Sequence, residues 1–394
     1  MSDPVIRIAA RGDGVTASGK HIAFGVPGDT LADDGELVKG PDHQSPPCRH
    51  FPACGGCQLQ HLTDAAYADY VTSRIVGGLA QHGLATTLRS PHLSPPRSRR
   101  RATLRAVRAG GRVLLGFNEG SSSRVIDLVE CLVLEPRLFA LVAPLRRLLA
   151  ELVPDRSAAD VHLALADQGV DVLLKGVTTD GYDAAVALTE FGEARGLARL
   201  SLDDGDGAEV RYEPVPATVT LSGVAVPLPP GAFLQATADG EAALAAAVIE
   251  AVGPAQRPLD LFAGLGTFAL ALPGQVTAAE ASRDSIFALK SAAAKAGRLL
   301  TAEHRDLYRR PYDVKELAAF DAAVLDPPRA GAKAQVKALA ASGVPRIAYV
   351  SCNPATFARD TAVLVDGGYR LDWIQPVGQF RWSTHVELAA AFSR

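Results

Sequence analysis

The stretch Arg346-Ile347-Ala348-Tyr349-Val350-Ser351-Cys352-Asn353-Pro354 joins an apolar run to an abrupt polar end. The run predicts a buried strand, and Ser-Cys-Asn-Pro predicts that the strand stops there. In a parallel sheet, such a strand delivers its last residues to the edge at which α/β folds bind ligands. Cys352 would then stand at a ligand site, where a deprotonated thiol can act as a nucleophile. The alternative is a small buried side chain, which is the commoner role of a single cysteine.

From about Pro229 onward, short apolar runs alternate with Ala-rich segments of helical length. This alternation is typical of an α/β domain with a doubly wound parallel sheet. Pro258 to Thr267 predicts a strand, a Gly-rich turn and a helix, and such a turn lets a cofactor lie against bare backbone at a helix N-terminus. The turn contains Phe262 and Gly264 and lacks the lysine of a nucleoside-triphosphate loop.

Two acidic residues follow the next strands of this region. Glu280 lies twenty residues after Asp260 and ends an apolar run, the position from which an acid binds ribose hydroxyls. Asp306 follows the next predicted strand and suits an adenine amino group. These features fit either a dinucleotide or S-adenosylmethionine, and the turn alone does not decide between them.

Asp326 and Glu387 supply carboxylates near further strands. Asp326-Pro327-Pro328-Arg329 ends an apolar run, and Glu387 lies among strand-forming residues close to the C-terminus. A thiol, a carboxylate and a methyl donor suit methylation of a pyrimidine at carbon 5, which becomes nucleophilic once a thiolate adds to carbon 6. Cys352 would be the nucleophile, Glu387 the base and Asp326 a hydrogen-bonding partner of a uracil that has left its stack. This chemistry favours S-adenosylmethionine as the cofactor.

The other four cysteines form a second candidate site. Cys48, Cys54 and Cys57 have the spacing C-x5-C-x2-C, and the glycines between them let the loop fold back so that the thiols converge. Cys131 follows a strand-like segment, residues 125–129, and can complete the set. Four thiolates suit a structural zinc ion or an iron–sulfur cluster, and the spacing leaves both open.

The region between the cysteine loop and the α/β domain is rich in arginine. Eight arginines lie between Pro91 and Arg124, against one acid, Glu119. Alternation over residues 102–108 predicts a strand that carries several of them on one face. A solvated strand face and an RNA phosphate track explain this pattern equally well. A helix from Pro136 to Leu152 and alternating strands follow, and we interpret them as scaffold.

The bulk numbers are those of an ordinary soluble protein: 394 residues, 48% hydrophobic and 21% charged, with a net charge of −3. We divide the chain into a small N-terminal β module (1–42), a β-rich central domain (43–228) and the α/β domain (229–394). A helix over about 60–90 is expected to pack on the α/β domain. The N-terminus lacks a signal-peptide pattern and no transmembrane stretch is indicated, so we expect a cytoplasmic protein.

Together these motifs resemble the bacterial RNA (uracil-5-)-methyltransferases, in particular the iron–sulfur members that make 5-methyluridine in 23S rRNA. The resemblance covers most of the chain. It implies a Rossmann-like S-adenosylmethionine-dependent catalytic domain and an N-terminal module that is a shortened form of the family's TRAM β-barrel. It also implies an RNA substrate, with 23S rRNA as the target, and a [4Fe–4S] cluster.

The resemblance further assigns roles to individual residues. It implies a cluster held by Cys48, Cys54, Cys57 and Cys131, and a catalytic set of Cys352, Glu387 and Asp326. It implies an S-adenosylmethionine pocket formed by Gln235, Phe262, Gly264, Glu280, Asp306 and Asp326. Two segments depart from the family pattern. Thr237 stands where Asn is usual, and residues 378–383 differ from the usual Asp-x-Phe-Pro-x-Thr.

Several alternatives stay open at this point. Transfer RNA is the nearest alternative target, although the resemblance implies that dedicated tRNA enzymes lack the cluster. Cytosine-5 methylation fits less well, because enzymes of that class carry a second cysteine where this chain has Arg329. A non-catalytic metal-bound RNA-binding protein or assembly factor is the alternative from another class. We expect a monomer with no DNA or membrane partner, since no pairing helix is evident.

Overall fold

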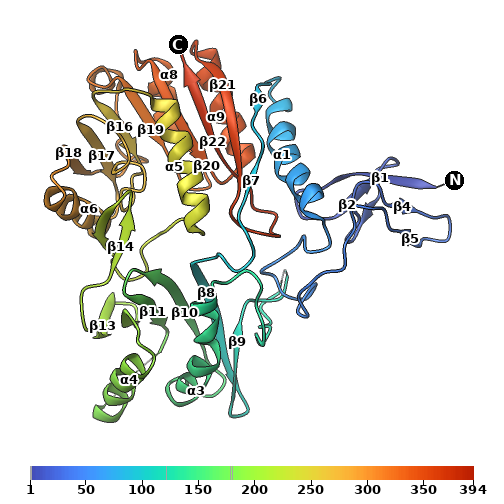
Figure 1. Cartoon of the computed structure of the whole chain (residues 1–394), viewed down its shortest axis with the longest axis vertical. Coiled ribbons are helices and arrows are strands. Elements are labelled where there is room, and N and C mark those ends of the chain that lie inside the picture. Colours follow the sequence, from blue (N-terminus) through green and yellow to red (C-terminus); the bar gives the residue numbers. More distant parts are fainter. Residues whose placement is uncertain (1, 121, 178, 180) are drawn as a thin grey trace.

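The sheet that carries the predicted site lies in the C-terminal part of the chain (Figure 1). The computed structural model describes residues 2–120, 122–177, 179 and 181–394. Within them this sheet has the strand order β18-β17-β16-β19-β20-β22-β21-β6, and β7 also pairs with β21. Its strands are β6 (Thr87–Leu88), β7 (His92–Leu93), β16 (Pro258–Leu261), β17 (Val276–Glu280), β18 (Leu300–His304), β19 (Ala322–Leu325), β20 (Arg346–Ser351), β21 (Arg370–Gly378) and β22 (Glu387–Ser393).

Strands β16 to β20 are parallel, whereas β22 inserts antiparallel between β20 and β21. The strand order reverses at β16, which pairs with β17 on one side and β19 on the other. At such a point the carboxyl ends of neighbouring strands leave a crevice in which α/β folds bind ligands. β19 is buried along its whole length because helices cover both faces of the sheet. The predicted α/β fold class is therefore confirmed.

Helices cover the two faces of this sheet in separate apolar cores. α5 and α6 pack on one face, and α1, α8 and α9 pack on the other, together with the short α7. Their bounds are α1 (Asp64–Ala80), α5 (Ala238–Val252), α6 (Arg283–Lys295), α7 (Val314–Leu317), α8 (Lys333–Ala340) and α9 (Pro354–Asp366). α1 comes from far away in the sequence, yet Tyr67 and Tyr70 of this helix are buried in the core that it shares with α9.

A second sheet, below the first in Figure 1, has the order β13-β12-β11-β10-β8-β9. All its neighbouring strands are antiparallel except β11 and β12. Its strands are β8 (Arg101–Ala109), β9 (Arg112–Gly116), β10 (Ala158–Ala166), β11 (Gly169–Lys175), β12 (Arg199–Asp203) and β13 (Ala208–Tyr212). The helices beside it are α2 (Pro136–Ala140), α3 (Val142–Leu152) and α4 (Tyr182–Ala194). A hairpin of β14 (Thr218–Leu221) and β15 (Val224–Pro227) follows.

Two elements of this region differ from the prediction. The helix expected over residues 136–152 is divided into α2 and α3. Pro144 has no N–H to donate to the carbonyl of Ala140, so the helix cannot continue unbroken. Residues 125–129 form no regular strand. Instead, the Asp127 side chain accepts the N–H of Leu115 at 3.2 Å, which competes with strand pairing.

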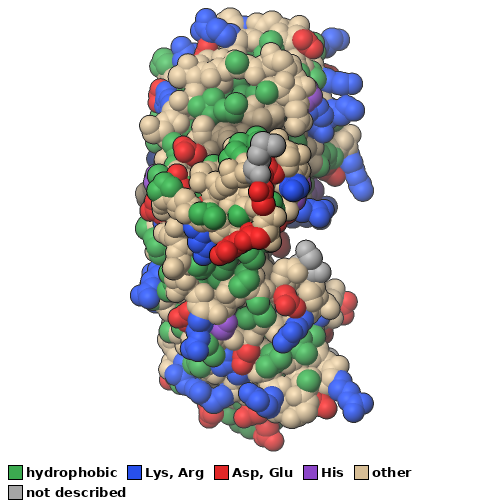
Figure 2. Space-filling view, turned by 90° about the vertical axis from the view of Figure 1, so that its right-hand side faces the viewer, with side chains coloured by type: hydrophobic (Ala, Val, Ile, Leu, Met, Phe, Trp, Pro, Cys, Tyr) green, Lys and Arg blue, Asp and Glu red, His purple; other side chains and the backbone are tan. Residues whose placement is uncertain are grey.

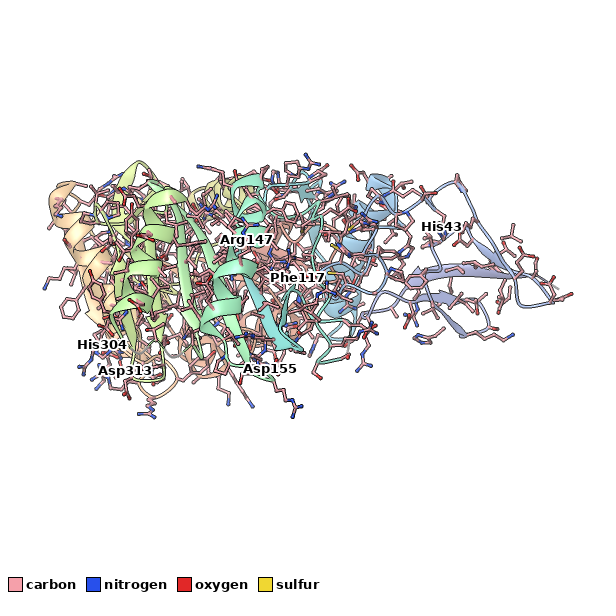
Figure 3. The ribbon with its side chains drawn as sticks, turned by 90° about the horizontal axis from the view of Figure 1, so that it is seen from below. His43, Phe117, Arg147, Asp155, His304 and Asp313 are labelled. Carbon is pink, nitrogen blue, oxygen red and sulfur yellow. The ribbon has the colours of Figure 1, made fainter. Side chains whose placement is uncertain are left out.

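The N-terminal sheet extends to one side of the molecule, as Figures 1 and 3 show. Its order is β3-β2-β1-β4-β5, with β1 (Asp3–Ile8), β2 (Gly14–Thr16), β3 (His21–Ile22), β4 (Thr30–Leu31) and β5 (Leu37–Val38). In Figure 3, His43 lies toward this sheet, Phe117 near the middle, and His304 and Asp313 toward the opposite end. No helix in the described part of the chain is long and apolar enough to cross a membrane.

Candidate active site

Cys352 lies between β20 and α9, on a short polar turn. The strand ends at Ser351, and Pro354 begins the helix. Asn353 caps α9, since its Oδ1 accepts the N–H of Ala355 at 3.1 Å. The turn is therefore fixed at both ends, and the thiol projects from the edge of the sheet at which the strand order reverses.

Strand pairing brings Glu387 next to Cys352, although the two are far apart in sequence. In the antiparallel pair of β20 and β22, Ser351 lies opposite Leu388. One further step along this register places Cys352 opposite Glu387. Asp326 directly follows β19, which pairs in parallel with β20, so it ends at the same edge of the sheet.

The Asp-Pro-Pro-Arg turn that starts at Asp326 is tied to the turn that holds Cys352. The carbonyl oxygen of Arg329 accepts hydrogen bonds from Asn353 Nδ2 at 3.0 Å and from Thr356 Oγ1 at 3.2 Å. The two polar turns therefore support each other, and the distance between the thiol and the Asp326 carboxyl does not depend on a free loop.

A cavity of about 600 Å³ opens at this edge of the sheet. Its lining includes every residue that the resemblance assigned to the S-adenosylmethionine pocket: Gln235, Phe262, Gly264, Glu280, Asp306 and Asp326. Cys352 and Glu387 also line it. The volume is that of an ordinary small-molecule site.

The walls of this cavity fit S-adenosylmethionine. Gly264 has a φ of +54° and nothing within 4 Å of the place where a Cβ would stand, so a ligand can lie against its backbone. Glu280 accepts the N–H groups of Gly264 at 3.0 Å and Ser282 at 2.7 Å, and its remaining lone pairs can accept ribose hydroxyls. The rings of Phe262 and Tyr308 pack with centroids 5.6 Å apart and give the cavity an aromatic wall.

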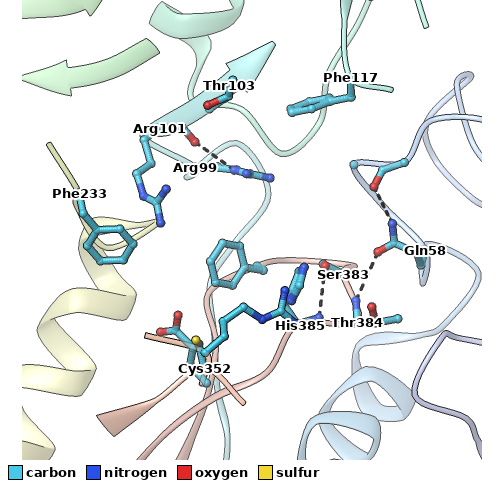
Figure 4. A pocket seen from close by; sticks show the side chains of 16 residues that line it. Gln58, Arg99, Arg101, Thr103, Phe117, Phe233, Cys352, Ser383, Thr384 and His385 are labelled. Atoms are coloured by element: carbon cyan, nitrogen blue, oxygen red, sulfur yellow. Dashed lines mark hydrogen bonds between the residues drawn. The ribbon is translucent and has the colours of Figure 1, made fainter. Parts of the chain in front are cut away.

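A second cavity, of about 500 Å³, adjoins the first, and Phe233, Arg329, Cys352 and Glu387 line both. Figure 4 shows its other walls, which include Gln58, Arg99, Arg101, Thr103, Phe117, Ser383, Thr384 and His385. The guanidinium of Arg101 lies over the ring of Phe233, 4.3 Å from its centroid. Aromatic rings and guanidinium groups are the side chains on which unstacked bases and phosphates bind.

The titratable groups at the junction of the cavities have raised pKa values. Burial and the nearby Asp326 raise the pKa of Glu387 to about 8, while the amide of Gln379 opposes the shift. Burial raises the pKa of Asp326 to about 7, against a hydrogen bond from Gln235. Burial and the two carboxyls raise the pKa of the Cys352 thiol to about 11. The thiol is therefore protonated at neutral pH, and a cation bound beside it would favour the thiolate.

Several arginines of the basic run bind other parts of the protein instead of solvent. Arg100 pairs with Glu241 at 2.5 Å, and Arg105 pairs with Asp160 at 2.7 Å. Arg108 donates to the carbonyl of Val153. Arg99 and Arg101 also donate to main-chain carbonyls, and both line the second cavity. The side of the molecule in Figure 2 carries both acidic and basic side chains, and Lys and Arg side chains gather along its upper right edge.

Four thiols gather beside this second cavity. Cys48, Cys54, Cys57 and Cys131 are all free cysteines. They lie close enough for their charges to interact: burial and then Cys131, Cys54 and Cys48 raise the pKa of Cys57 to about 12. Backbone N–H groups of residues 133 and 134 hydrogen-bond Cys131.

The donor set of these thiols fits a metal cofactor, but the ligand geometry is not formed. Within residues 2–120, 122–177, 179 and 181–394, no group of three or more His, Cys, Asp or Glu side chains is placed to hold a metal ion. Four converging thiols with N–H donors are nevertheless the groups that a four-thiolate cluster or a zinc ion uses. The structure therefore supports the gathering of the four cysteines and leaves the metal a prediction.

Known proteins with similar sequences are RNA methyltransferases. The chain is 49% identical to an uncharacterized RNA methyltransferase of Zymomonas mobilis over 99% of both chains. It is 34% identical to the 23S rRNA (uracil(1939)-C(5))-methyltransferase RlmD of Chromohalobacter salexigens, over 91% of this chain and 78% of that relative. A family model described as tRNA (Uracil-5-)-methyltransferase matches residues 228–394. The chain belongs to the RNA (uracil-5-)-methyltransferase family.

A solved structure shows the same fold. The tRNA (uracil-54, C5)-methyltransferase of Pyrococcus abyssi, in complex with S-adenosyl-L-homocysteine, matches over 100% of both chains with a TM-score of 0.76 and 22% identity. The protein is thus an S-adenosylmethionine-dependent RNA (uracil-5-)-methyltransferase, as the resemblance implied. The non-catalytic interpretation is not supported, and the iron–sulfur subtype stays a prediction.

The methyltransferase site also contains residues that no sequence motif indicates. Gln379 belongs to the segment that departs from the family pattern, and it donates to Glu387 and Gln235. A usable signal was its place in the short connection between two neighbouring strands, since such connections lie next to the strand ends they join. Thr237, the other departure, caps α5, because its Oγ1 accepts the N–H of Gly240 at 3.1 Å.

Proposed function

We propose that this methyltransferase transfers a methyl group from S-adenosylmethionine to carbon 5 of a uridine in 23S rRNA, through a covalent bond between Cys352 and carbon 6. The observation that carries the proposal is the junction of the two cavities. One cavity fits the methyl donor, and the other has arginines and aromatic rings suited to RNA. Because Cys352 and Glu387 line both, the thiol and the carboxylate would stand between the methyl donor and the uracil.

Cys352 would act as the nucleophile. Its thiolate adds to carbon 6, and the electrons of the double bond between carbons 5 and 6 move onto the carbonyl oxygen at carbon 4 as an enolate. Carbon 5 then attacks the methyl group of the sulfonium, and the bond between methyl and sulfur breaks to release S-adenosylhomocysteine. The positive charge of the sulfonium would favour the thiolate of Cys352, whose pKa burial and the neighbouring acids raise.

Glu387 would act as the base that completes the reaction. It takes the proton from carbon 5, the double bond re-forms, and the bond between sulfur and carbon 6 breaks to return the thiolate. Its pKa of about 8 suits a group that must accept a proton near neutral pH. Asp326, with a pKa of about 7, would hydrogen-bond the polar edge of the uracil.

The relatives support two RNA classes to different degrees. The 34% identical relative that is named as a 23S rRNA methyltransferase supports 23S rRNA. The name of the matching family, and the tRNA substrate in the name of the enzyme with the same fold, favour tRNA as the second candidate. We place 23S rRNA first because the likeness to the 23S rRNA enzyme is closer in sequence and spans most of this chain.

We further propose that Cys48, Cys54, Cys57 and Cys131 hold a [4Fe–4S] cluster with a structural role. When bound, the cluster would fasten the loop of residues 48–57, part of which lines the second cavity. Residues 43–228 would then form the iron–sulfur-bearing RNA-binding domain, next to the shortened TRAM-like module of residues 1–42, and residues 229–394 the catalytic domain. The proximity of the thiols supports the cluster, because each has others within electrostatic range.

The test uses RNA from a strain that lacks the protein, purified enzyme and methyl-labelled S-adenosylmethionine. We expect 5-methyluridine in one fragment of 23S rRNA, and a loss of about 10³-fold or more with Cys352→Ala. Target RNA carrying 5-fluorouridine should trap the wild-type enzyme as a covalent complex on a denaturing gel, since fluorine cannot leave carbon 5 as a proton does. Label in tRNA would assign the second candidate, and absence of both label and complex would contradict the proposal.

A further inference from the structure

Gln379 places a buried amide directly beside Glu387. It follows β21, and 1% of its surface is exposed. Its Nε2 donates to Oε2 of Glu387 and, at 2.8 Å, to Oε1 of Gln235. An amide in this position touches both the carboxyl that would take the proton and a residue that lines the methyl-donor cavity.

Main-chain groups fix the orientation of this amide. Oε1 of Gln379 accepts the backbone N–H of Ala236 at 2.8 Å and that of Thr237 at 3.3 Å. A flipped amide would set its NH₂ group against these two donors, so Nε2 has to face Glu387. Gly240 leaves the room for this arrangement, since a Cβ there would lie 2.7 Å from the Cβ of Gln379.

The hydrogen bond from Gln379 also fixes the orientation of the Gln235 amide. Because its Oε1 accepts from Gln379, its Nε2 points the other way and donates to Oδ2 of Asp326 at 3.2 Å. Two amides therefore connect the buried carboxyl of Glu387 with the partly buried carboxyl of Asp326, and each carboxyl receives an N–H donor. Such donors stabilise the ionised form of an acid that burial would otherwise keep neutral.

We propose that Gln379 is a positioning residue for proton abstraction: its amide holds Oε2 of Glu387 and leaves Oε1 to take the proton from carbon 5. The inference rests on the proposed role of Glu387 as the base. The direction of the effect agrees with the geometry, because the hydrogen bond from Gln379 lowers the pKa of Glu387 against its burial.

The first test follows a single turnover of Gln379→Leu on natural RNA. We expect the covalent methylated adduct to form at the wild-type rate and to resolve at least about tenfold more slowly, so that it accumulates on denaturing gels. A merely structural role would slow adduct formation and weaken RNA binding together. Gln375→Leu is the matched control, since Gln375 lies on β21, the strand that Gln379 follows, and donates to the carbonyl of Ser90 at 2.9 Å.

A second variant, Gln379→Glu, keeps the size of the side chain and tests the direction of the hydrogen bond. In the wild type, adduct resolution should rise with pH through about 8 as Glu387 ionises. In the variant, the new carboxyl can donate to Glu387 only while it is protonated. Resolution in the variant needs Glu387 ionised while the new carboxyl keeps its proton. Its rate should therefore pass through a maximum and then fall, whereas the wild-type rate rises to a plateau. A rate that rises in parallel with the wild type would overturn the proposal.

Glu387→Gln separates a failure of this inference from a failure of the proposed function. Accumulation of the adduct in Glu387→Gln, together with normal resolution in Gln379→Leu, would overturn the positioning role and keep Glu387 as the base. Normal resolution in Glu387→Gln would overturn the base assignment, and the inference with it.

Discussion

Glu387 is a carboxyl that the fold buries in spite of its charge, and the neighbouring Asp326 is partly buried. Burial raises the pKa of Glu387 from 4.5 to about 8 and that of Asp326 from 3.8 to about 7. Between the unfolded and folded values, the folded chain binds more protons than the unfolded chain. The free energy of unfolding therefore falls as the pH rises across this window. The chemistry that needs these acids costs stability in the pH range where the base is active.

We predict that Glu387→Gln stabilises the protein increasingly as the pH rises. Its amide keeps an oxygen that accepts from Gln379 but cannot ionise, whereas the wild type loses up to about 1.4 kcal/mol per pH unit from Glu387. Urea unfolding at about pH 5.5 and about pH 8.5 measures the free energy of unfolding of both proteins. The excess of Glu387→Gln over the wild type should be larger at the higher pH. Glu193→Gln, at an exposed position, should have the same free energy of unfolding as the wild type at both pH values. An equal difference between Glu387→Gln and the wild type at both pH values would contradict the idea that ionising the buried Glu387 costs stability.

Among the elements, those that end at the site were predictable because their signals are local. β16, β17, β19 and β20 lie where apolar runs stop at polar turns, and β20 ends at Ser351, one residue before the thiol. The place of Gln379 between β21 and β22 was a usable signal, but its orientation was not predictable, because Ala236 and Thr237 are distant in sequence and contact it only in the folded chain. The division of the 136–152 helix followed from Pro144, a signal that the apolar periodicity concealed.

The loop that carries three of the four clustered thiols yields a prediction of its own. Gly55 packs so closely that a Cβ would lie 2.6 Å from the carbonyl oxygen of Asn118. Gly55→Ala must displace this loop, because backbone cannot give way as a flexible side chain does. We expect anaerobically purified Gly55→Ala to hold less than about half of the wild-type iron and sulfide and to unfold at a lower temperature.

Gly120→Ala is the control for this prediction, because no atom of the described residues outside its chain neighbours lies within 4 Å of its added Cβ. It should match the wild type in metal content and unfolding temperature. Full iron content in Gly55→Ala would show that the loop geometry does not govern the cluster. Stoichiometric zinc without iron in the wild-type protein would contradict the cluster itself.

On the scale of the whole molecule, the two large sheets are joined at the segment that precedes β8. Ser94 hydrogen-bonds Thr237 at 2.8 Å, and the Nε of Arg100 donates to the carbonyl of Gln235 at 3.0 Å. The Arg101 guanidinium donates to the carbonyl of Leu234. These contacts hold the segment containing Gln235, which lines the first cavity, against β8, which lines the second cavity. The relative position of the two cavities therefore depends in part on these polar contacts, beside the apolar core that the two sheets share.

Arg100 provides the sharpest test of this connection. Its side chain is 9% exposed and that of Glu241 is 13% exposed, so Arg100→Leu leaves a buried carboxylate without its partner. We expect a loss of about 3 kcal/mol in the free energy of unfolding and a higher KM for S-adenosylmethionine, as the Gln235 segment loses its donor.

Arg105→Leu, which breaks the half-exposed pair with Asp160, should cost at most about 1 kcal/mol and leave KM unchanged. The double variant Arg100→Leu, Glu241→Leu should recover much of the stability but not the KM, because the carbonyl of Gln235 still lacks its donor. Equal costs for Arg100→Leu and Arg105→Leu in urea unfolding would contradict the idea that this contact joins the two halves of the site.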